Sequence, residues 1–160
     1  MTAEVDTQVL KDDVVLLSPI NFSIHHDLIV SAALKYKNND LTKEQIEQAM
    51  ENILHGWLAS FKGVQFQVFF IGKFLGRFTF DSYLVDTVAK LPKDDALGLR
   101  SAKLVLAWFD EFYNEELFSY PDVRNKAARK SIERLGFKFV EVFMYLKNRH
   151  SLMRRKPCHS

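Results

Sequence analysis

The sequence has a single cysteine, no long apolar run and little net charge, and each scarcity excludes a class of protein. Cys158 cannot form a disulfide within the chain, and one thiolate cannot hold a metal ion alone, so a reducing compartment fits. No segment approaches the roughly 18 uninterrupted apolar residues of a membrane-spanning helix. Residues 1–6 lack the basic-then-apolar order of a signal peptide. We therefore expect a cytoplasmic chain with no membrane partner.

The charge of the chain is close to balanced, at +2 near neutral pH. Such a small excess does not indicate nucleic-acid binding by the whole protein. Basic residues nevertheless gather at the C-terminus, and we interpret residues 148–160 as a solvated basic tail that makes at most a weak nucleic-acid contact. Removing that tail should then weaken any such binding and flatten its salt dependence.

The length and composition fit one folded domain. A chain of 160 residues buries about 68–70% of its unfolded surface in a single core. Helical spacing of apolar residues predicts helices, whereas alternation and short apolar runs predict strands. The predicted strands span 14–17, 64–71, 74–80, 83–91, 117–123 and 137–147, and the predicted helices span 24–36, 42–57, 102–116 and 125–135.

Two local signals add detail to these predictions. Thr42 followed by Gln45 fits a capping box at the start of a helix, and apolar residues at helical intervals continue that helix to Trp57. Gly72 and Lys73 lie between two runs rich in phenylalanine and predict a hairpin turn. The sequence thus predicts two helices followed by three strands in its first half.

A third signal lies between Asn125 and Phe137, where the chain reads Asn-Lys-Ala-Ala-Arg-Lys-Ser-Ile-Glu-Arg-Leu-Gly-Phe. Asn125 can cap a helix, and Gly136 can end it because glycine turns cheaply out of a helix. This segment resembles the closing motif of the GNAT superfamily of acyl-CoA-dependent N-acyltransferases, whose order of elements is also similar. Pro92 followed by Gly98 resembles the pyrophosphate loop of that family.

The resemblance implies an α/β fold, with one GNAT-like domain over residues 13–147 and a mixed central sheet flanked by four helices. Residues 1–12 would form an N-terminal arm. In the family, backbone N–H groups at the start of the helix after the fourth strand hold the CoA pyrophosphate. The resemblance therefore implies acetyl-CoA as the cofactor and an acceptor amine near the first two helices. The implied cofactor-binding residues are Gly98, Leu99, Arg100, Ser101 and Asn125.

The loop departs from the family pattern in the sign of its charge. The family presents Gln or Arg, then Gly, then Gly or Ala, where this chain has Asp95, Gly98 and Arg100. Asp94 and Asp95 suit a helix N-terminus, but they would repel a diphosphate. Two like charges about 4 Å apart repel by about 1 kcal/mol in water and by about 4 kcal/mol at an effective dielectric constant of about 20.

The second departure concerns proton transfer. Many family members have a tyrosine seven residues after the motif asparagine, where this chain has Ile132, which cannot transfer a proton. Asp110, Glu111 and Glu141 are candidate bases by residue type only, so no catalytic residue is assigned. The adjacent His25 and His26 would point about 100° apart on a helix, so we expect no metal site there.

Two hypotheses remain open. The chain is an acetyl-CoA-dependent N-acetyltransferase with an unusual cofactor loop, or it is a non-catalytic interaction protein that kept the fold and needs no cofactor. Both departures favour the second hypothesis. Under it the chain resembles the small GNAT-like internal virion and head-associated proteins of short-tailed bacteriophages, which implies a protein partner or assembly and a location in the virion.

Overall fold

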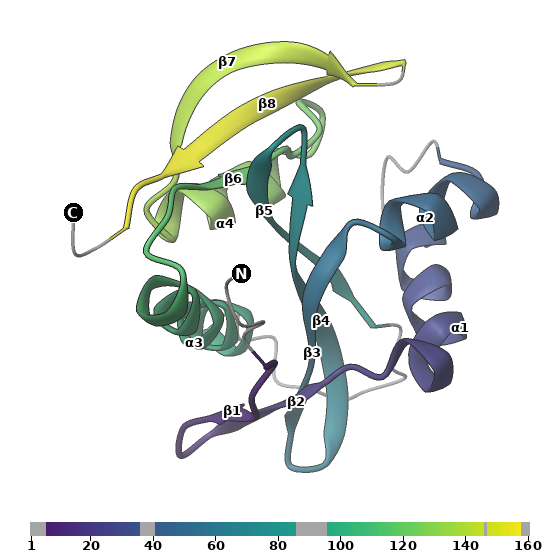
Figure 1. Cartoon of the computed structure of the whole chain (residues 1–160), viewed down its shortest axis with the longest axis vertical. Coiled ribbons are helices and arrows are strands. Elements are labelled where there is room, and N and C mark those ends of the chain that lie inside the picture. Colours follow the sequence, from purple (N-terminus) through teal and green to yellow (C-terminus); the bar gives the residue numbers. More distant parts are fainter. Residues whose placement is uncertain (1–5, 36–40, 86–95, 146, 158–160) are drawn as a thin grey trace, which may run out of the picture.

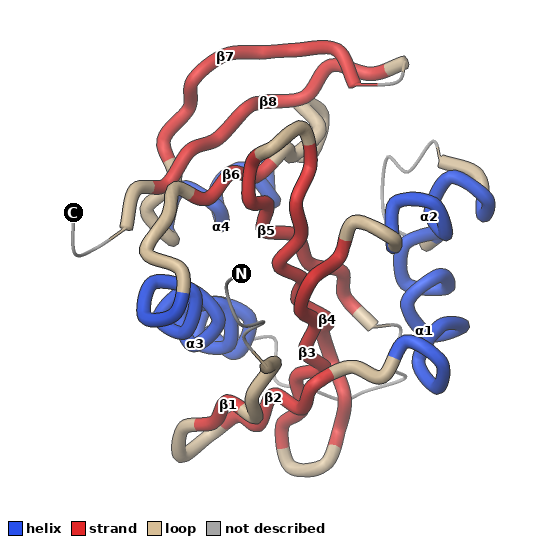
Figure 2. Tube along the Cα trace, viewed as in Figure 1, coloured by secondary structure: helices blue, strands red, loops and turns tan. Residues whose placement is uncertain are grey.

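The computed structural model describes residues 6–35, 41–85, 96–145 and 147–157. Within these ranges the chain forms one mixed sheet with helices on both faces, as Figures 1 and 2 show. This arrangement confirms the predicted α/β class with a central sheet flanked by four helices. The helices are α1 (Phe22–Leu34), α2 (Lys43–Met50), α3 (Ala96–Phe112) and α4 (Lys126–Arg134).

The sheet has eight strands in the order β1-β2-β3-β4-β5-β6-β8-β7. Neighbouring strands are antiparallel except β5 and β6, which run parallel. A parallel pair requires a crossover connection, and α3 lies on the crossover between these two strands. The strands are β1 (Leu10–Lys11), β2 (Val15–Pro19), β3 (Ile53–Phe61), β4 (Val64–Phe74), β5 (Arg77–Leu84), β6 (Leu117–Ser119), β7 (Lys138–Tyr145) and β8 (Asn148–Arg155).

Both faces of the sheet carry a hydrophobic core because successive side chains of a strand point to opposite sides. On one face, Trp57 of β3 and Phe69 of β4 pack in the larger core with Phe109 of α3. On the other face, Leu58 of β3 packs in a second core with Ile29 of α1. Burial on both faces explains why the central strands read as nearly continuous apolar runs.

The helix predicted from Thr42 to Trp57 is correct only in its first half. The capping box is present, since the backbone N–H of Gln45 donates to Thr42 Oγ1 and the backbone N–H of Thr42 donates to Gln45 Oε1. Helix α2 ends at Met50, however, and Ile53–Phe61 form β3. A short apolar run fits the period of a helix as well as that of a strand. Pairing with β2 on one edge and with β4 on the other selects the strand.

The predicted hairpin turn is displaced along the chain. It lies at Leu75 and Gly76, whose φ angles of 52° and 76° suit a tight hairpin turn. Gly72 instead lies within β4, where an added Cβ would come within 2.8 Å of the Asn52 carbonyl oxygen. Of the strand predicted over 83–91, Tyr83 and Leu84 end β5, and residues 86–91 lie outside the described residues. Three strands still lie between α2 and α3, as predicted, because β3 precedes β4 and β5.

The predicted C-terminal tail is wrong over most of its length. The predicted final strand, 137–147, matches β7, but the chain then turns back and Asn148–Arg155 form β8. This strand pairs with β6 on one edge and β7 on the other, and Met153 is fully buried. The basic residues of this segment resemble those of a solvated tail. Which of its positions are buried becomes evident only once the partner strands on both edges are known.

Two cations of the predicted basic tail are paired with carboxylates. Arg154 lies 3.4 Å from Glu116, and Arg155 lies 2.7 Å from Asp110. The weak nucleic-acid contact stays a prediction, and it has less support because two of the cations that would make it are paired with carboxylates. At the other end, the predicted arm over residues 1–12 is also shorter than expected, because Leu10–Lys11 pair with β2 as β1.

Candidate functional site

The parallel strands β5 and β6 separate soon after they meet. Their described pairings are Phe78 with Leu117 and Thr79 with Phe118, after which β6 ends at Ser119. Strand β5 continues to Leu84, paired with β4 on its other edge. The sheet therefore opens between β5 and the chain that follows β6, close to the N-terminal half of the crossover helix α3 (Figure 2).

Asp81 lies on β5 just beyond the last pairing with β6. Alternation along β5 places Phe80 in the core against α3 and Asp81 on the opposite face. The Tyr83 hydroxyl donates to Asp81 Oδ2 at 3.1 Å, and the backbone N–H of Ser82 donates to Asp81 Oδ1 at 2.9 Å. The carboxylate is thus held on the face of the sheet that α1 and α2 cover elsewhere.

Desolvation raises the pKa of Asp81 to about 6. The hydrogen bonds from Tyr83 and Ser82 and the nearby His150 act in the opposite direction, but the desolvation by surrounding protein atoms outweighs them. The side chain of Asp81 is nevertheless exposed to solvent. A carboxylate with a pKa this close to neutrality can accept a proton from a substrate and release it to water.

The residues predicted to hold a pyrophosphate lie in the first two turns of α3, and three of them serve the fold. Arg100 donates to Asp12 and, at 2.7 Å, to Asp13 in the turn between β1 and β2. Ser101 is fully buried, and its hydroxyl donates to the Leu97 carbonyl oxygen at 2.8 Å. An added Cβ at Gly98 would meet the Gln67 amide oxygen at 2.9 Å.

Gly98 therefore permits close packing of α3 against β4, and Leu99 beside it is partly buried. The structure brings Gly98, Leu99, Arg100 and Ser101 onto one helix end, as expected for consecutive residues. Their assignment to a cofactor stays a prediction. Pro92, Asp94 and Asp95, on which the expected charge repulsion rests, lie outside the described residues.

The closing motif has the local structure that the sequence predicts. Asn125 caps α4, with its side-chain oxygen accepting from the Ala128 backbone N–H at 3.0 Å, so that oxygen is already used within the helix. Gly136 ends the helix with a φ of 95°, a conformation that favours glycine. Ile132, at the position of the family tyrosine, packs against the larger core.

The acidic residues named by type do not lie near the opening of the sheet. Asp110 is buried on α3, where its carboxylate accepts two hydrogen bonds from Arg155. Glu111 and Glu141 are exposed on α3 and β7. Asp81 was not predicted as a site residue, although an acidic residue between Phe80 and Tyr83 in an apolar strand is the signal that marks it.

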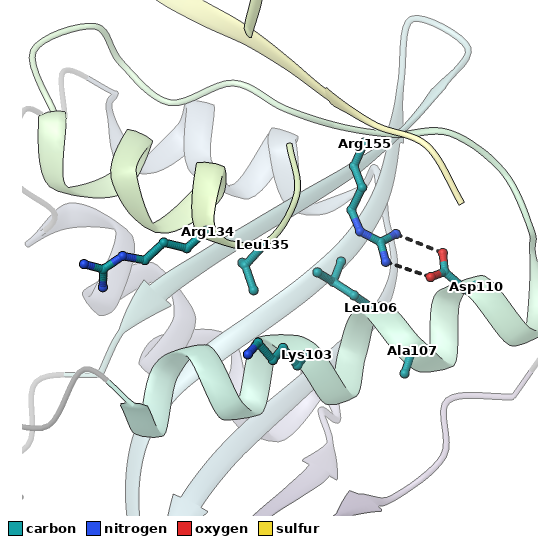
Figure 3. A pocket seen from close by; sticks show the side chains of 7 residues that line it. All are labelled: Lys103, Leu106, Ala107, Asp110, Arg134, Leu135 and Arg155. Carbon is teal, nitrogen blue, oxygen red and sulfur yellow. Dashed lines mark hydrogen bonds and ion pairs between the residues drawn. The ribbon is translucent and has the colours of Figure 1, made fainter. Parts of the chain in front are cut away.

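A cavity of about 310 Å³ lies between α3, α4 and β8 (Figure 3). The buried pair of Asp110 and Arg155 forms one end of it. The cavity is on the α3 side of the sheet and is therefore separate from Asp81. Its lining residues are Lys103, Leu106, Ala107, Asp110, Arg134, Leu135 and Arg155.

The described part of the chain lacks two other kinds of feature. No group of three or more His, Cys, Asp or Glu side chains among these residues is placed to hold a metal ion. His26 instead contacts Asp27 at 3.0 Å and Glu47 at 2.9 Å. Within the same ranges, no helix is long and apolar enough to span a membrane.

No protein-family model and no curated protein sequence matches this chain. Solved structures, in contrast, do match this chain. A GNAT-family acetyltransferase from Bacillus anthracis aligns with a TM-score of 0.67 and 11% identity, covering 94% of this chain and 99% of that one. AAC(6')-Ib, solved with ribostamycin and coenzyme A, aligns with a TM-score of 0.67 and 14% identity, covering 90% and 94%.

A third structure is RimL, a ribosomal L7/L12 alpha-N-protein acetyltransferase solved with coenzyme A. It aligns with a TM-score of 0.67 and 12% identity, covering 93% of this chain and 98% of RimL. Identities this low establish shared architecture rather than shared chemistry. The chain therefore has the fold of the GNAT acetyltransferases, which confirms the fold that the closing motif implied.

Proposed function

We propose that the protein is an acetyl-CoA-dependent N-acetyltransferase. The observation that carries the proposal is Asp81, a carboxyl group with a pKa raised to about 6, positioned where β5 leaves β6. Perturbed carboxyl groups of this kind concentrate at catalytic sites. The fold supports the proposal as well, since AAC(6')-Ib and RimL share it and were both solved with coenzyme A.

The described residues fit an elongated acyl carrier in two respects. The separation of β5 from β6 frees one edge of β5 beyond Thr79 for backbone hydrogen bonds to an extended polar chain. The N-terminal half of α3 lies beside that separation and suits an anionic group through its backbone N–H groups. Acetyl-CoA, when bound, would supply a thioester carbonyl that an amine can attack.

Asp81 would act as the general base in this reaction. The acceptor must first lose one proton to water and become a neutral amine. The Asp81 carboxylate would then take the second proton, which the nitrogen loses as the new C–N bond forms, while the C–S bond breaks and CoA leaves as a thiolate. The hydrogen bonds from Tyr83 and from the Ser82 backbone would hold the carboxylate in place for that transfer. Position and pKa together support Asp81 in the role that residue type alone suggested for Asp110, Glu111 and Glu141.

This proposal replaces the non-catalytic hypothesis as the preferred one. Ile132 has a hydrocarbon side chain and cannot transfer a proton, but Asp81 would supply a base that the motif comparison did not contain. The three solved structures described above are acetyltransferases, and none of them is a virion protein. A role in a bacteriophage particle therefore has no support from these structures.

Thermal unfolding with and without millimolar acetyl-CoA tests the proposal. A ligand at 100 times its dissociation constant stabilises the folded state by about 2.7 kcal/mol, so a saturable rise in Tm is expected. Asp81→Asn should keep this rise and lose turnover, since a base acts on the acceptor rather than on the cofactor. A rise that occurs only after Asp94→Gly and Asp95→Arg would restore the non-catalytic hypothesis and its charge repulsion.

A further inference from the structure

The charge of the chain is divided very unevenly along its length. Residues 124–160 hold 11 of the 22 lysines and arginines but only 2 of the 20 acidic residues, which gives them a net charge of +9. Residues 1–123 hold the other 11 cations and the other 18 acids, and so carry a net charge of −7. The overall charge of +2 is the small difference between the two. A large excess of one sign in part of a chain indicates a partner of the opposite sign.

Only part of this positive charge is neutralised within the fold. Four arginines of the segment lie between 2.7 and 3.4 Å from a carboxylate oxygen, and these are Arg124, Arg129, Arg154 and Arg155. Three further cations lie on α4 and are exposed, and none of them forms an ion pair with another described residue. We name these three residues the α4 cation row: Lys126, Lys130 and Arg134.

The α4 cation row follows one side of the helix. Its members are four residues apart, so each lies above the last, about 6 Å further along the axis, and the whole row is about 12 Å long. Ile132 of α4 and Leu135 just after it pack against the larger core from the other side of the helix. The row therefore faces solvent and not the sheet.

The row does little to stabilise α4 itself. Like charges four residues apart repel each other and destabilise a helix. Lys126 occupies the first position, where the helix dipole favours acids, and only Arg134 in the last turn suits the dipole. Glu133 is the single acidic residue of α4, and it already pairs with Arg129 at 2.9 Å. Since the fold gains so little from these cations, they are available to an anion outside the chain.

The surroundings of the row favour the phosphate backbone of a nucleic-acid duplex. The phosphates of one strand advance about 3.4 Å each along a duplex, so a row of about 12 Å faces about three or four of them. A single strand would also need free rings on which its bases stack, and the Phe139 ring beside α4 already lies under Arg129 at 4.7 Å. A membrane surface would need apolar side chains to insert, but the apolar side of α4 is used in the core.

We propose that the α4 cation row is a nucleic-acid-binding surface, which contacts the phosphate backbone of a duplex without reading its sequence. Lys103 of α3 extends this surface, since it lines the same cavity as Arg134 (Figure 3). The surface is part of a folded helix and is therefore distinct from the contact predicted for residues 148–160. It requires neither acetyl-CoA nor acetyl transfer, so the inference is independent of the proposed function.

Binding of a labelled DNA duplex to the full chain, followed by fluorescence anisotropy without acetyl-CoA, tests the proposal. The logarithm of the binding constant should fall with the logarithm of the salt concentration, with a slope of about −0.9 for each phosphate contact. Three or four contacts thus predict a roughly 40- to 150-fold loss of affinity between about 50 and about 200 mM salt. Duplexes of unrelated sequence should bind equally. No binding at about 50 mM salt, or binding that does not change with salt, would overturn the inference.

Variants show whether the α4 cation row is responsible. Glutamine keeps a high helix propensity without the charge, so the row variant is Lys126→Gln, Lys130→Gln and Arg134→Gln. It should weaken binding at least roughly tenfold at about 50 mM salt and reduce the size of the salt slope by about 3, whereas Lys130→Gln alone should reduce it by about 1.

The matched control removes the same charge from exposed lysines outside the row. It is the triple variant Lys11→Gln, Lys43→Gln and Lys62→Gln. This protein should bind the duplex with nearly the wild-type affinity and slope. Equal weakening by the two triple variants, in proteins with unchanged circular dichroism spectra, would show that only net charge matters and would contradict the assignment.

Competition separates a duplex from other anionic partners. The unlabelled duplex, a single-stranded oligonucleotide, polyglutamate and phosphatidylserine vesicles would each be added at equal concentrations of negative charge. The duplex should displace the labelled probe at the lowest concentration. Displacement at an equal or lower concentration by the single strand, by polyglutamate or by the vesicles would indicate a different partner and overturn the inference.

Discussion

Arg155 of β8 and Asp110 of α3 form a buried ion pair, with two hydrogen bonds of 2.9 and 2.7 Å from the guanidinium to the carboxylate. The side chains are only 8% and 6% exposed. The pair joins the crossover helix α3 to β8, which lies between β6 and β7 in the sheet. Removing one partner takes two charge-assisted hydrogen bonds away from a buried charge, which costs far more than the loss of an exposed pair.

Arg155→Met should therefore lower the free energy of unfolding by about 3–5 kcal/mol. Urea unfolding measures the change. Arg154→Met is the matched control one residue away, since Arg154 is exposed and lies 3.4 Å from Glu116, and its loss should cost about 0–1 kcal/mol. The double variant Asp110→Leu, Arg155→Met should recover much of the stability. Equal losses for Arg154→Met and Arg155→Met would contradict the role of the buried pair.

Asp81→Asn should reduce acetyl transfer by about 10²–10⁴-fold, the usual contribution of a general base. In the wild type, the rate should rise with pH through about 6, because Asp81 accepts a proton only when it is ionised. Steady-state rates between pH 5 and pH 8 measure both effects. Tyr83→Phe removes one hydrogen bond that favours the ionised carboxylate, so the midpoint of the profile should move to higher pH. A flat pH profile would exclude Asp81 as the base.

The same carboxyl group should influence stability with a predictable sign. The folded pKa of Asp81 is about 6 and the unfolded value is 3.8, so the folded state binds the proton more tightly between them. Wild-type stability should therefore fall as the pH rises from about 4 to about 6. Asp81→Asn lacks this titrating carboxyl group. The Tm of the variant minus the Tm of the wild type should therefore increase across the same interval. Parallel Tm curves for the two proteins would show that the pKa of Asp81 is ordinary.

Gly136→Ala should destabilise the protein by more than about 1 kcal/mol, because the φ of 95° at this position suits glycine alone. An added Cβ meets nothing within 4 Å, so the cost would come from the backbone and not from a clash. Ser131→Ala, on the exposed side of α4, is the control and should change little. Thermal unfolding compares the two variants. An unchanged Tm for Gly136→Ala would show that this position does not require glycine.

The sequence predicted best what local chemistry decides. Asn125 and Gly136 begin and end α4 through groups within a few residues, so the pattern alone was sufficient. Strands β3 and β8 were missed because their residues become strands through partners elsewhere in the chain. The 148–155 segment has basic residues that resemble a solvated tail, and only pairing with β6 and β7 shows which of its positions are buried.

The candidate site was missed for a related reason. The predicted strands ended at Phe80 and began again at Tyr83, which left Asp81 outside the predicted sheet, whereas β5 runs without a break from Arg77 to Leu84. The pKa of Asp81 depends on protein atoms around it that no local pattern contains. The ring contacts of Phe74 with Tyr120 and of Phe143 with His150 likewise join segments that only the folded sheet brings together.

Acetyl transfer to an aliphatic amine is the most direct test of the proposed function. Wild-type protein and Asp81→Asn would each be incubated with acetyl-CoA and with putrescine, agmatine or a lysine-containing peptide. Free CoA thiol and acetylated amine would be measured together by mass spectrometry. We predict equal amounts of the two products in the wild type, with a rate that rises through about pH 6 and is largely lost in Asp81→Asn. Thiol release at the same low rate in both proteins, with no acetylated amine and no stabilisation by acetyl-CoA, would contradict it.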